Sequence, residues 1–158
     1  MMQPENQEVT TEEFAALMAG LPRRPDAALA VAVSGGPDSM ALTLLLRDWA
    51  AAQQVRVQAF TVDHALRAEA AVEAVQVARW CAGLGVPHET LRWEHAALTG
   101  RMQEQARRAR YDLLSAACAR HGIDILALAH HRDDQAETVL LRFAKGSGID
   151  GLAGMRAV

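Results

Sequence analysis

The most constraining feature of this chain is an alternation of short apolar runs with longer helical segments, repeated four times. The runs cover residues 28–33, 55–62, 86–93 and 123–129, and the helices expected after them cover residues 38–52, 69–84, 102–121 and 135–144. Parallel strands need a crossover connection, which is usually a helix. The sequence therefore predicts an α/β fold, a Rossmann-like parallel twisted sheet with helices on both faces.

An N-terminal segment precedes the first apolar run. Residues 12–21 have apolar side chains at helical spacing, with Thr10 or Thr11 as the expected cap, and the prolines at positions 22 and 25 end that pattern. We therefore expect residues 1–26 to be a helix with its linker and residues 27–158 to be the α/β domain. A length of 158 residues suits one such domain with a real core.

The first apolar run stops in a glycine turn and the chain restarts as a helix. The turn reads Ser34, Gly35, Gly36, Pro37, Asp38 and Ser39. Glycine can take a positive φ and lets a ligand approach the backbone closely, and the N–H groups that begin a helix favour an anion. Proline fits the first helical position, and two serine hydroxyls can add donors. This pattern predicts a phosphate-binding loop.

Asp38 is the unusual member of this loop. A carboxylate beside a polyphosphate is repelled unless a divalent cation bridges them, so Asp38 indicates a nucleotide held with Mg²⁺. The alternative is structural, in which Ser34 and Asp38 only cap and charge an ordinary helix. The loop is not a Walker P-loop or a dinucleotide fingerprint, because it lacks a following Lys-Ser/Thr and a G-x-G-x-x-G spacing.

Three polar clusters follow the carboxyl ends of expected strands, at residues 34–39, 63–67 and 130–137. Ligands of such sheets bind outside the carboxyl ends of the strands, so we expect the clusters to share one crevice. Asp134 and Glu137 lie one turn apart on a helix, where they complement its dipole, complete a Mg²⁺ site with Asp38, or hold a substrate ammonium. His130 and His131 have no further metal ligand at a suitable spacing.

The expected helix over residues 102–121 is rich in arginine. Its expected inner face carries Met102, Ala106, Ala109, Leu113 and Ala116. The arginines could meet phosphate or a nucleobase, although a solvated helix face is the commoner explanation of such a pattern. Arg110 lies on neither face, and we expect it to reach the crevice.

Charge and cysteine content exclude several classes of function. The net charge of -3 provides no bulk attraction to nucleic acid. Cys81 and Cys118 are too far apart for a C-x-x-C pair and are expected to be reduced core residues, which indicates a cytoplasmic protein. The polar, acidic start is not a signal peptide, and no apolar stretch approaches the ~20 residues that cross a bilayer.

Four sequence blocks together resemble a known family. The loop from Ser34 to Ser39 is similar to the S-G-G-x-D-S loop of the N-type ATP pyrophosphatases. Residues 62–67, 109–111, 130–138 and 146–152 are similar in order and spacing to bacterial tRNA(Ile)-lysidine synthetases. The resemblance covers residues 28–155. It implies a ligase that adenylates O2 of the wobble cytidine in the CAU anticodon of tRNA(Ile) and then joins free L-lysine, releasing AMP.

The resemblance also implies roles for individual residues. Ser34, Gly35, Gly36, Pro37, Asp38 and Ser39 would hold the phosphates of ATP, and Asp38 would share Mg²⁺ with Asp134. Val62 and His64 would lie near the adenosine, and Arg110 would stabilise charge during transfer. Asp134 and Glu137 would be candidates to seat the lysine ammonium. The implied partners are tRNA(Ile) and lysine, and a homodimer is left open.

The chain also departs from the family pattern. The family usually has Gly where Ala65 stands, and Pro and Ser near Ala68 and Ala70. The absence of that Ser from this chain removes an expected helix cap. The family continues into further domains that bind tRNA, so we expect this chain to be a catalytic domain with weak or no turnover alone. Two alternatives remain: a tRNA-thiolating enzyme of the same superfamily, which generally needs more cysteines, and a non-catalytic nucleotide-binding module.

Overall fold

Four short strands form one parallel sheet in the computed structural model, which describes residues 9–21, 27–95 and 100–129. The strands are β1 (Ala28–Ala32), β2 (Arg56–Asp63), β3 (His88–Arg92) and β4 (Ile125–Leu128). Their order across the sheet is β3-β2-β1-β4, and every pairing is parallel. The predicted fold class is therefore confirmed, because each strand is reached by a helical crossover from the strand before it.

The central strand β1 is buried along its whole length. Leu29 and Val31 belong to a core cluster on one face of the sheet, and Ala28, Ala30 and Ala32 belong to a cluster on the other. This alternation is the period of two expected of a strand. A strand buried on both faces is apolar throughout, which is why β1 reads as a continuous apolar run.

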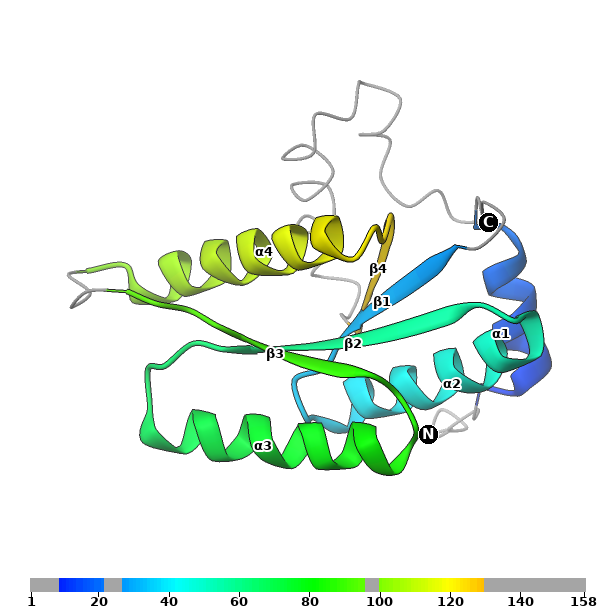
Figure 1. The fold of residues 1–158 in the computed structure, drawn as a ribbon, viewed down its shortest axis with the longest axis horizontal. Coiled ribbons are helices and arrows are strands. Elements are labelled where there is room, and N and C mark those ends of the chain that lie inside the picture. The colour runs from blue at the N-terminus through cyan, green and yellow to red at the C-terminus, as the bar shows by residue number, and fades with distance from the viewer. Residues whose placement is uncertain (1–8, 22–26, 96–99, 130–158) are drawn as a thin grey trace, which may run out of the picture.

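Helices cover both faces of the sheet. On one face lie α1 (Thr11–Ala19), α2 (Pro37–Gln53) and α3 (Ala68–Gly83), which contribute Phe14, Leu46, Trp49, Val77 and Cys81 to the first core cluster. On the other lies α4 (Met102–Arg120), which contributes Leu114, Ala117 and Cys118 to the second. Figure 1 shows α2 and α3 below the strands and α4 above them. None of the helices described is long and apolar enough to cross a membrane.

The starts of α1 and α2 follow the sequence expectations. Thr10 caps α1 in a capping box, in which its hydroxyl accepts from the Glu13 N–H and the Glu13 carboxylate accepts from the Thr10 N–H. Pro37 begins α2, where its missing N–H costs nothing. The expected helix over residues 135–144 lies outside the described residues.

The inner face of α4 differs from the expectation. The buried residues of α4 are Ala106, Leu114, Ala117 and Cys118, whereas Met102 is 49% exposed and Ala116 is exposed. Of the five residues expected inside, only Ala106 is buried, and Leu113 packs partly buried against the core. Alanine occurs at exposed positions of this helix (Ala116, Ala119) as well as at buried ones (Ala106, Ala117), so apolar spacing does not define its orientation.

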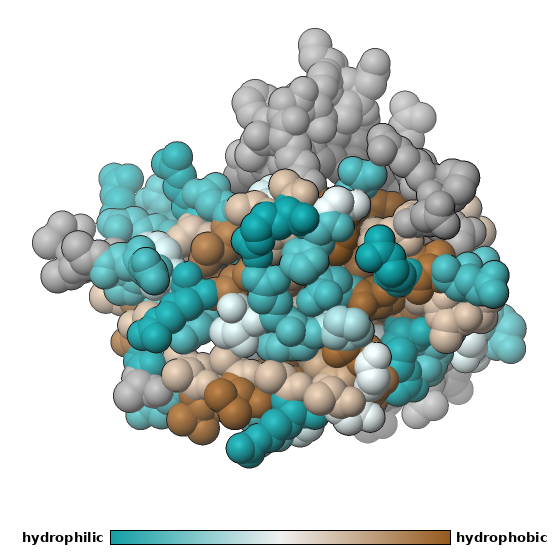
Figure 2. Space-filling view, in the orientation of Figure 1, coloured by the Kyte–Doolittle hydropathy of each residue, from teal (hydrophilic) through white to brown (hydrophobic). Residues whose placement is uncertain are grey.

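The outer side of α3 is also partly apolar. Val72, Val75 and Trp80 are exposed, while Val77 and Cys81 point into the core. Figure 2 shows hydrophobic residues along the lower edge of the view, where Figure 1 has α3. The hydrophobic pattern of α3 therefore predicts a helix but not which side of it faces the sheet.

Candidate functional site

The glycine loop, residues 34–36, lies at the carboxyl end of β1 and leads directly into α2. Gly35 has a φ of 86°, a conformation that residues with a Cβ rarely adopt. An ideal Cβ on Gly35 would also lie 2.9 Å from Cγ2 of Val77 on α3. Glycine is therefore required at position 35 both by backbone conformation and by the packing of α3.

Ser34 in the loop and Ser39 in the first turn of α2 hold the turn together rather than cap the helix. The N-cap of α2 is Gly36, and no side chain caps this end, so the structural alternative in which Ser34 caps α2 is wrong. Ser39 is buried, and its Oγ donates to the Gly36 carbonyl at 3.0 Å and accepts from the Ser34 N–H at 3.2 Å. The Oγ atoms of Ser34 and Ser39 are 3.2 Å apart. The loop is thus preorganised, with Ser34 exposed.

A cavity of about 240 Å³ lies beside the glycine loop. It is lined by Ala32, Val33, Ser34, Phe60, Thr61, Val62, His64, Leu66, Arg67, Ala70, Glu73, Ala74, Val77 and Arg110. These residues come from the carboxyl ends of β1 and β2, the loops that follow them, the first three turns of α3, and α4. The carboxyl ends of the strands and the helices on both faces therefore meet around one hollow, as expected for this fold class.

Four predicted site residues line this cavity together: Ser34, Val62, His64 and Arg110. Gly35, Gly36, Pro37, Asp38 and Ser39 lie beside it, in the loop and the first turn of α2, and are not part of its lining. Asp38 is exposed there. Two of the three expected polar clusters thus converge, together with Arg110 from the opposite face of the sheet.

His64 is the most unusual polar group of the cavity. Within the part of the chain that the structure describes, its buried Nδ1 has no hydrogen-bond partner. Burial lowers the pKa of His64 from its ordinary value of 6.5, the charge of Arg110 lowers the pKa further, and Asp63 opposes both effects. A buried imidazole nitrogen without a partner is costly, which makes His64 a candidate to contact a ligand in the cavity that it lines.

The backbone next to His64 shows why the family usually has glycine at position 65, where this chain has alanine. Asp63 is buried, and its Oδ1 accepts the Ala65 N–H at 2.9 Å, which closes a tight turn at the end of β2. Ala65 has a φ of 51° in this turn. Glycine takes such a conformation without strain, whereas alanine costs about 1 kcal/mol or more. The turn therefore keeps its shape in this chain at some cost in stability.

The remaining predicted residues cannot be located. His130, His131, Asp134 and Glu137 lie outside the described residues. Within residues 9–21, 27–95 and 100–129, no three His, Cys, Asp or Glu side chains gather closely enough to hold a metal ion. The pairing of Asp38 with Asp134 around Mg²⁺ therefore stays a prediction.

Several polar residues of the cavity were not predicted. Thr61, Glu73 and Arg67 line it. Arg67 belongs to the family-like block at residues 62–67, but no role was predicted for it. Thr61 precedes the end of β2 by two residues, so its place near the carboxyl edge of the sheet was a usable signal. Glu73 comes from the second turn of α3, for which the sequence offers no comparable signal.

The two cysteines lie on opposite faces of the sheet. Cys81 packs in the cluster under α2 and α3, and Cys118 packs in the cluster under α4. Both are buried, and burial raises the pKa of the Cys81 thiol. They cannot act together on one ligand, and Cys81 is a poor nucleophile because its thiolate is disfavoured.

Comparison with known families and proteins gives consistent matches. A family model described as a PP-loop domain matches residues 6–158. A tRNA(Ile)-lysidine synthase of Ruegeria pomeroyi is 50% identical over 139 residues, which cover 88% of this chain and 33% of the relative. The tRNA(Ile)-lysidine synthase of Bradyrhizobium diazoefficiens is 46% identical over 157 residues, covering 98% and 43%. The chain thus spans less than half the length of these relatives.

Solved structures share the fold at low sequence identity. A U34-tRNA thiolase from Methanococcus maripaludis superposes with a TM-score of 0.63 at 18% identity, over 88% of this chain and 52% of the other. An NMN synthetase from Francisella tularensis superposes with a TM-score of 0.55 at 12% identity, over 92% and 75%. These similarities concern the fold alone.

Proposed function

The chain belongs to the ATP-binding PP-loop domain family, and from this membership we propose that it binds ATP in the cavity at the carboxyl ends of β1 and β2. We further propose that it is the ATP-activating part of a ligase that forms lysidine in tRNA(Ile). The relatives at 46% and 50% identity support this choice of reaction. The observation that carries the proposal of ATP binding is the gathering of Ser34, Val62, His64 and Arg110 around one cavity beside the glycine loop.

The described residues suit a nucleotide in three respects. Gly35 has no Cβ to meet Val77 and takes a positive φ, so the glycine loop can make the tight backbone turn that a phosphate loop needs. The start of α2 has no side-chain cap and lies directly after the glycine loop, where the positive end of the helix dipole favours phosphate oxygens. The unused nitrogen of His64 supplies a polar contact beside the apolar Val62, which suits the adenosine.

Mg²⁺ binding is proposed through two carboxylates. Asp38, exposed in the first turn of α2, and Asp134 would hold the ion through hard oxygen ligands. When bound, the ion would offset the negative charge of the phosphates and of the pyrophosphate leaving group. Without it, Asp38 would repel the phosphates that its own loop binds.

The proposed reaction has two steps. O2 of the wobble cytidine of the CAU anticodon attacks the α-phosphorus of ATP, and the bond to pyrophosphate breaks. The ε-amine of free lysine then attacks C2 of the cytidine, and the C2–O bond breaks to release AMP. Arg110 would stabilise negative charge on the transferred phosphoryl group from the α4 side of the cavity. Asp134 and Glu137 would seat the lysine ammonium.

The proposed partners and location follow from this reaction. The substrates are tRNA(Ile) with a CAU anticodon and L-lysine, a homodimer is proposed as the assembly, and the cytoplasm is the proposed compartment. Two buried free cysteines suit a reducing compartment. The thiolating alternative is disfavoured, because the two cysteines lie on opposite faces of the sheet and cannot share a cluster or a persulfide.

The decisive experiment is an AMP-release assay on a chimera in which this chain replaces the matching part of the R. pomeroyi relative. AMP release that requires both lysine and tRNA(Ile) is the expected result. Binding of ATP without any AMP release would favour the non-catalytic module, and a transfer of sulfur would favour the thiolase. The unmodified relative serves as the positive control.

Asp38→Asn tests the phosphate loop separately. In the chain alone, we expect the affinity for ATP with Mg²⁺ to fall about 10- to 100-fold, because a charged ligand of the ion is lost. Asp48→Asn is the matched control, since Asp48 is exposed on the same helix and pairs with Arg47. Unchanged affinity in Asp38→Asn would contradict the proposed loop function.

A further inference from the structure

Val33, the last residue before the glycine loop, is held by β2 through both its N–H and its carbonyl. Its N–H donates to the Phe60 carbonyl at 2.8 Å, and its carbonyl accepts from the Thr61 Oγ1 at 2.9 Å. Val33 and Thr61 are both buried. The Thr61 hydroxyl thus donates the hydrogen bond that a backbone N–H would donate inside the sheet, at the point where the chain leaves β1 for Ser34.

The direction of these hydrogen bonds determines a second one. A carbonyl can only accept, so the single hydroxyl proton of Thr61 is used on Val33. Thr61 Oγ1 also lies 2.8 Å from Nε2 of His88, the first residue of β3. Nε2 must therefore carry a proton and donate it to Thr61. The result is a hydrogen-bonded chain from His88 through Thr61 to Val33, across three neighbouring segments of the sheet.

From this chain of contacts we propose that Thr61 and His88 are positioning residues for the glycine loop, with His88 held in the tautomer that is protonated at Nε2. The inference rests on the proposed ATP-binding function of that loop. Thr61 acts from the β2 side on the peptide that leads into the loop. Val77 confines Gly35 from the α3 side, so the loop is fixed between two supports.

The environment of His88 agrees with a neutral ring. Burial lowers the pKa of His88 from 6.5, and Glu89 only partly opposes this effect. A neutral imidazole has one N–H, and the contact with Thr61 assigns it to Nε2. The opposite arrangement, with Thr61 donating to His88, would leave the buried Val33 carbonyl without its donor, and buried carbonyls without donors are rare.

The first test does not depend on ATP. Nitrogen-15 NMR of the imidazole of His88 in the unmodified chain at neutral pH is expected to show Nε2 protonated and Nδ1 bare. A spectrum of the other tautomer would overturn the proposal, whatever the chain binds. This separates its failure from failure of the proposed function, which would show as an absence of ATP binding by the wild-type chain.

The second test measures ATP affinity in variants. Thr61→Val is expected to weaken the binding of ATP with Mg²⁺ about tenfold, the usual effect of one lost hydrogen bond, and to shift the amide resonances of Ser34 and Gly35. Thr61→Ser keeps the hydroxyl and is expected to stay within about twofold of wild type. His88→Gln keeps a donor near the Nε2 position and is expected to weaken binding less than His88→Phe.

Thr90→Val is the matched control, because Thr90 pairs in register with Thr61 on the neighbouring strand, is exposed and does not line the cavity. It is expected to leave both the loop resonances and the affinity unchanged. The proposal is overturned if Thr61→Val behaves like Thr90→Val, or if Thr61→Ser loses as much affinity as Thr61→Val. If Thr61→Val does not fold, the comparison of Thr61→Ser with wild type and the tautomer measurement decide the question.

Discussion

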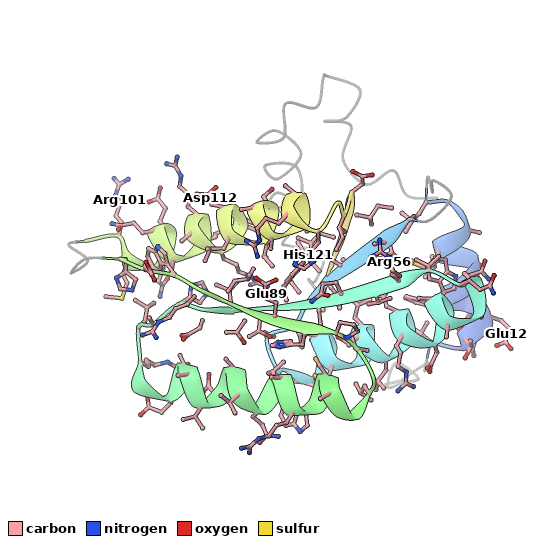
Figure 3. The ribbon with its side chains drawn as sticks, viewed as in Figure 1. Glu12, Arg56, Glu89, Arg101, Asp112 and His121 are labelled. Atoms are coloured by element: carbon pink, nitrogen blue, oxygen red, sulfur yellow. The ribbon has the colours of Figure 1, made fainter. Side chains whose placement is uncertain are left out.

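The two ends of the sheet hold their polar side chains in opposite ways. At the carboxyl end, the buried Nδ1 of His64 has no partner in the described part of the chain, and Arg110 lines the cavity and acts through its charge on His64. At the amino end of β3, Glu89 is bound by Arg120 and by His121, whose Nε2 lies 2.8 Å from the carboxylate. Figure 3 shows Glu89 and His121 facing one another.

This difference distinguishes polar groups that are available to bind a ligand from polar groups that stabilise the fold. Polar groups left without partners in a hollow are expensive unless a ligand completes them, so they indicate a binding site. Polar groups that satisfy one another across two elements join those elements instead. The amino end therefore stabilises the packing of α4 on β3, and the carboxyl end is prepared for a ligand.

The strongest way to break the comparison is Gly35→Ala. The new Cβ would lie 2.9 Å from Cγ2 of Val77, and the alanine would have to adopt a φ of 86°. We expect the affinity for ATP with Mg²⁺ to fall about 100-fold as the loop shifts, and the free energy of unfolding to fall by about 1–2 kcal/mol. Isothermal titration calorimetry and urea unfolding measure the two effects.

Gly122→Ala at the amino end is the matched control. Gly122 also has a positive φ, 64°, but a Cβ there would meet nothing within 4 Å. Only backbone strain of about 1 kcal/mol is expected, with unchanged ATP affinity. Equal losses of affinity in the two variants would remove the distinction between the ends.

Arg110→Met sharpens the electrostatic part of the comparison. The charge of Arg110 lowers the pKa of His64, so its removal is expected to raise that pKa in an NMR titration. We also expect AMP release by the chimera to fall about 100-fold, since a cation beside the reacting phosphate is lost. Arg108→Met, an exposed neighbour on α4 that pairs with Asp112, should change neither quantity. A lowered or unchanged pKa in Arg110→Met would contradict the geometry.

The stability of the chain should depend on pH through two half-buried histidines, His64 and His88. His64 and His88 both have a pKa below 6.5 in the folded chain and titrate near 6.5 when unfolded. Below pH 6.5 the unfolded chain therefore binds more protons, and the free energy of unfolding falls as the pH decreases toward the folded pKa values. Well above pH 6.5 both histidines are neutral in the folded and the unfolded chain, so this loss of stability is absent.

Urea unfolding at pH 7.5 and at pH 5.5 measures this dependence. His88→Gln should lose less stability than wild type between the two pH values, because one of the two lowered groups is absent. A wild-type chain that is more stable at pH 5.5, together with an unchanged difference in His88→Gln, would contradict the prediction.

The smallest expected effect concerns the amino end. Glu89→Gln removes the charge that pairs with Arg120 and His121, but these side chains are 34%, 56% and 39% exposed, so solvent screens the pair. We expect the free energy of unfolding to fall by about 0.5 kcal/mol, with no change in ATP affinity. A loss of ATP affinity in Glu89→Gln would show that the two ends are coupled.

Sequence reasoning predicts the fold well where burial and local conformation agree. The apolar run at residues 28–33 predicts β1 because a doubly covered strand must be apolar throughout. The run at residues 86–93 predicts β3 less accurately, since Val86 is buried but precedes the strand, which begins at His88. Burial alone does not distinguish the strand from the chain that leads into it.

The candidate site is predictable only in part. The glycine loop and His64 follow from residue types at strand ends, and Arg110 was expected at the crevice. The bond between Thr61 and His88 joins residues 27 positions apart and depends on strand order, which one sequence does not contain. Asp134 and Glu137 lie outside the described residues, so their roles stay predictions.

The central claim is that ATP binds at the carboxyl end of the sheet, and a titration followed by amide NMR tests it most directly. A non-hydrolysable ATP analogue with Mg²⁺ is added to the isotopically labelled chain. We predict saturable shifts at Gly35, Gly36 and His64, and none at Gly85 and Gly122, the positive-φ glycines of the amino end. Shifts at Gly85 and Gly122 without shifts in the glycine loop would contradict the account.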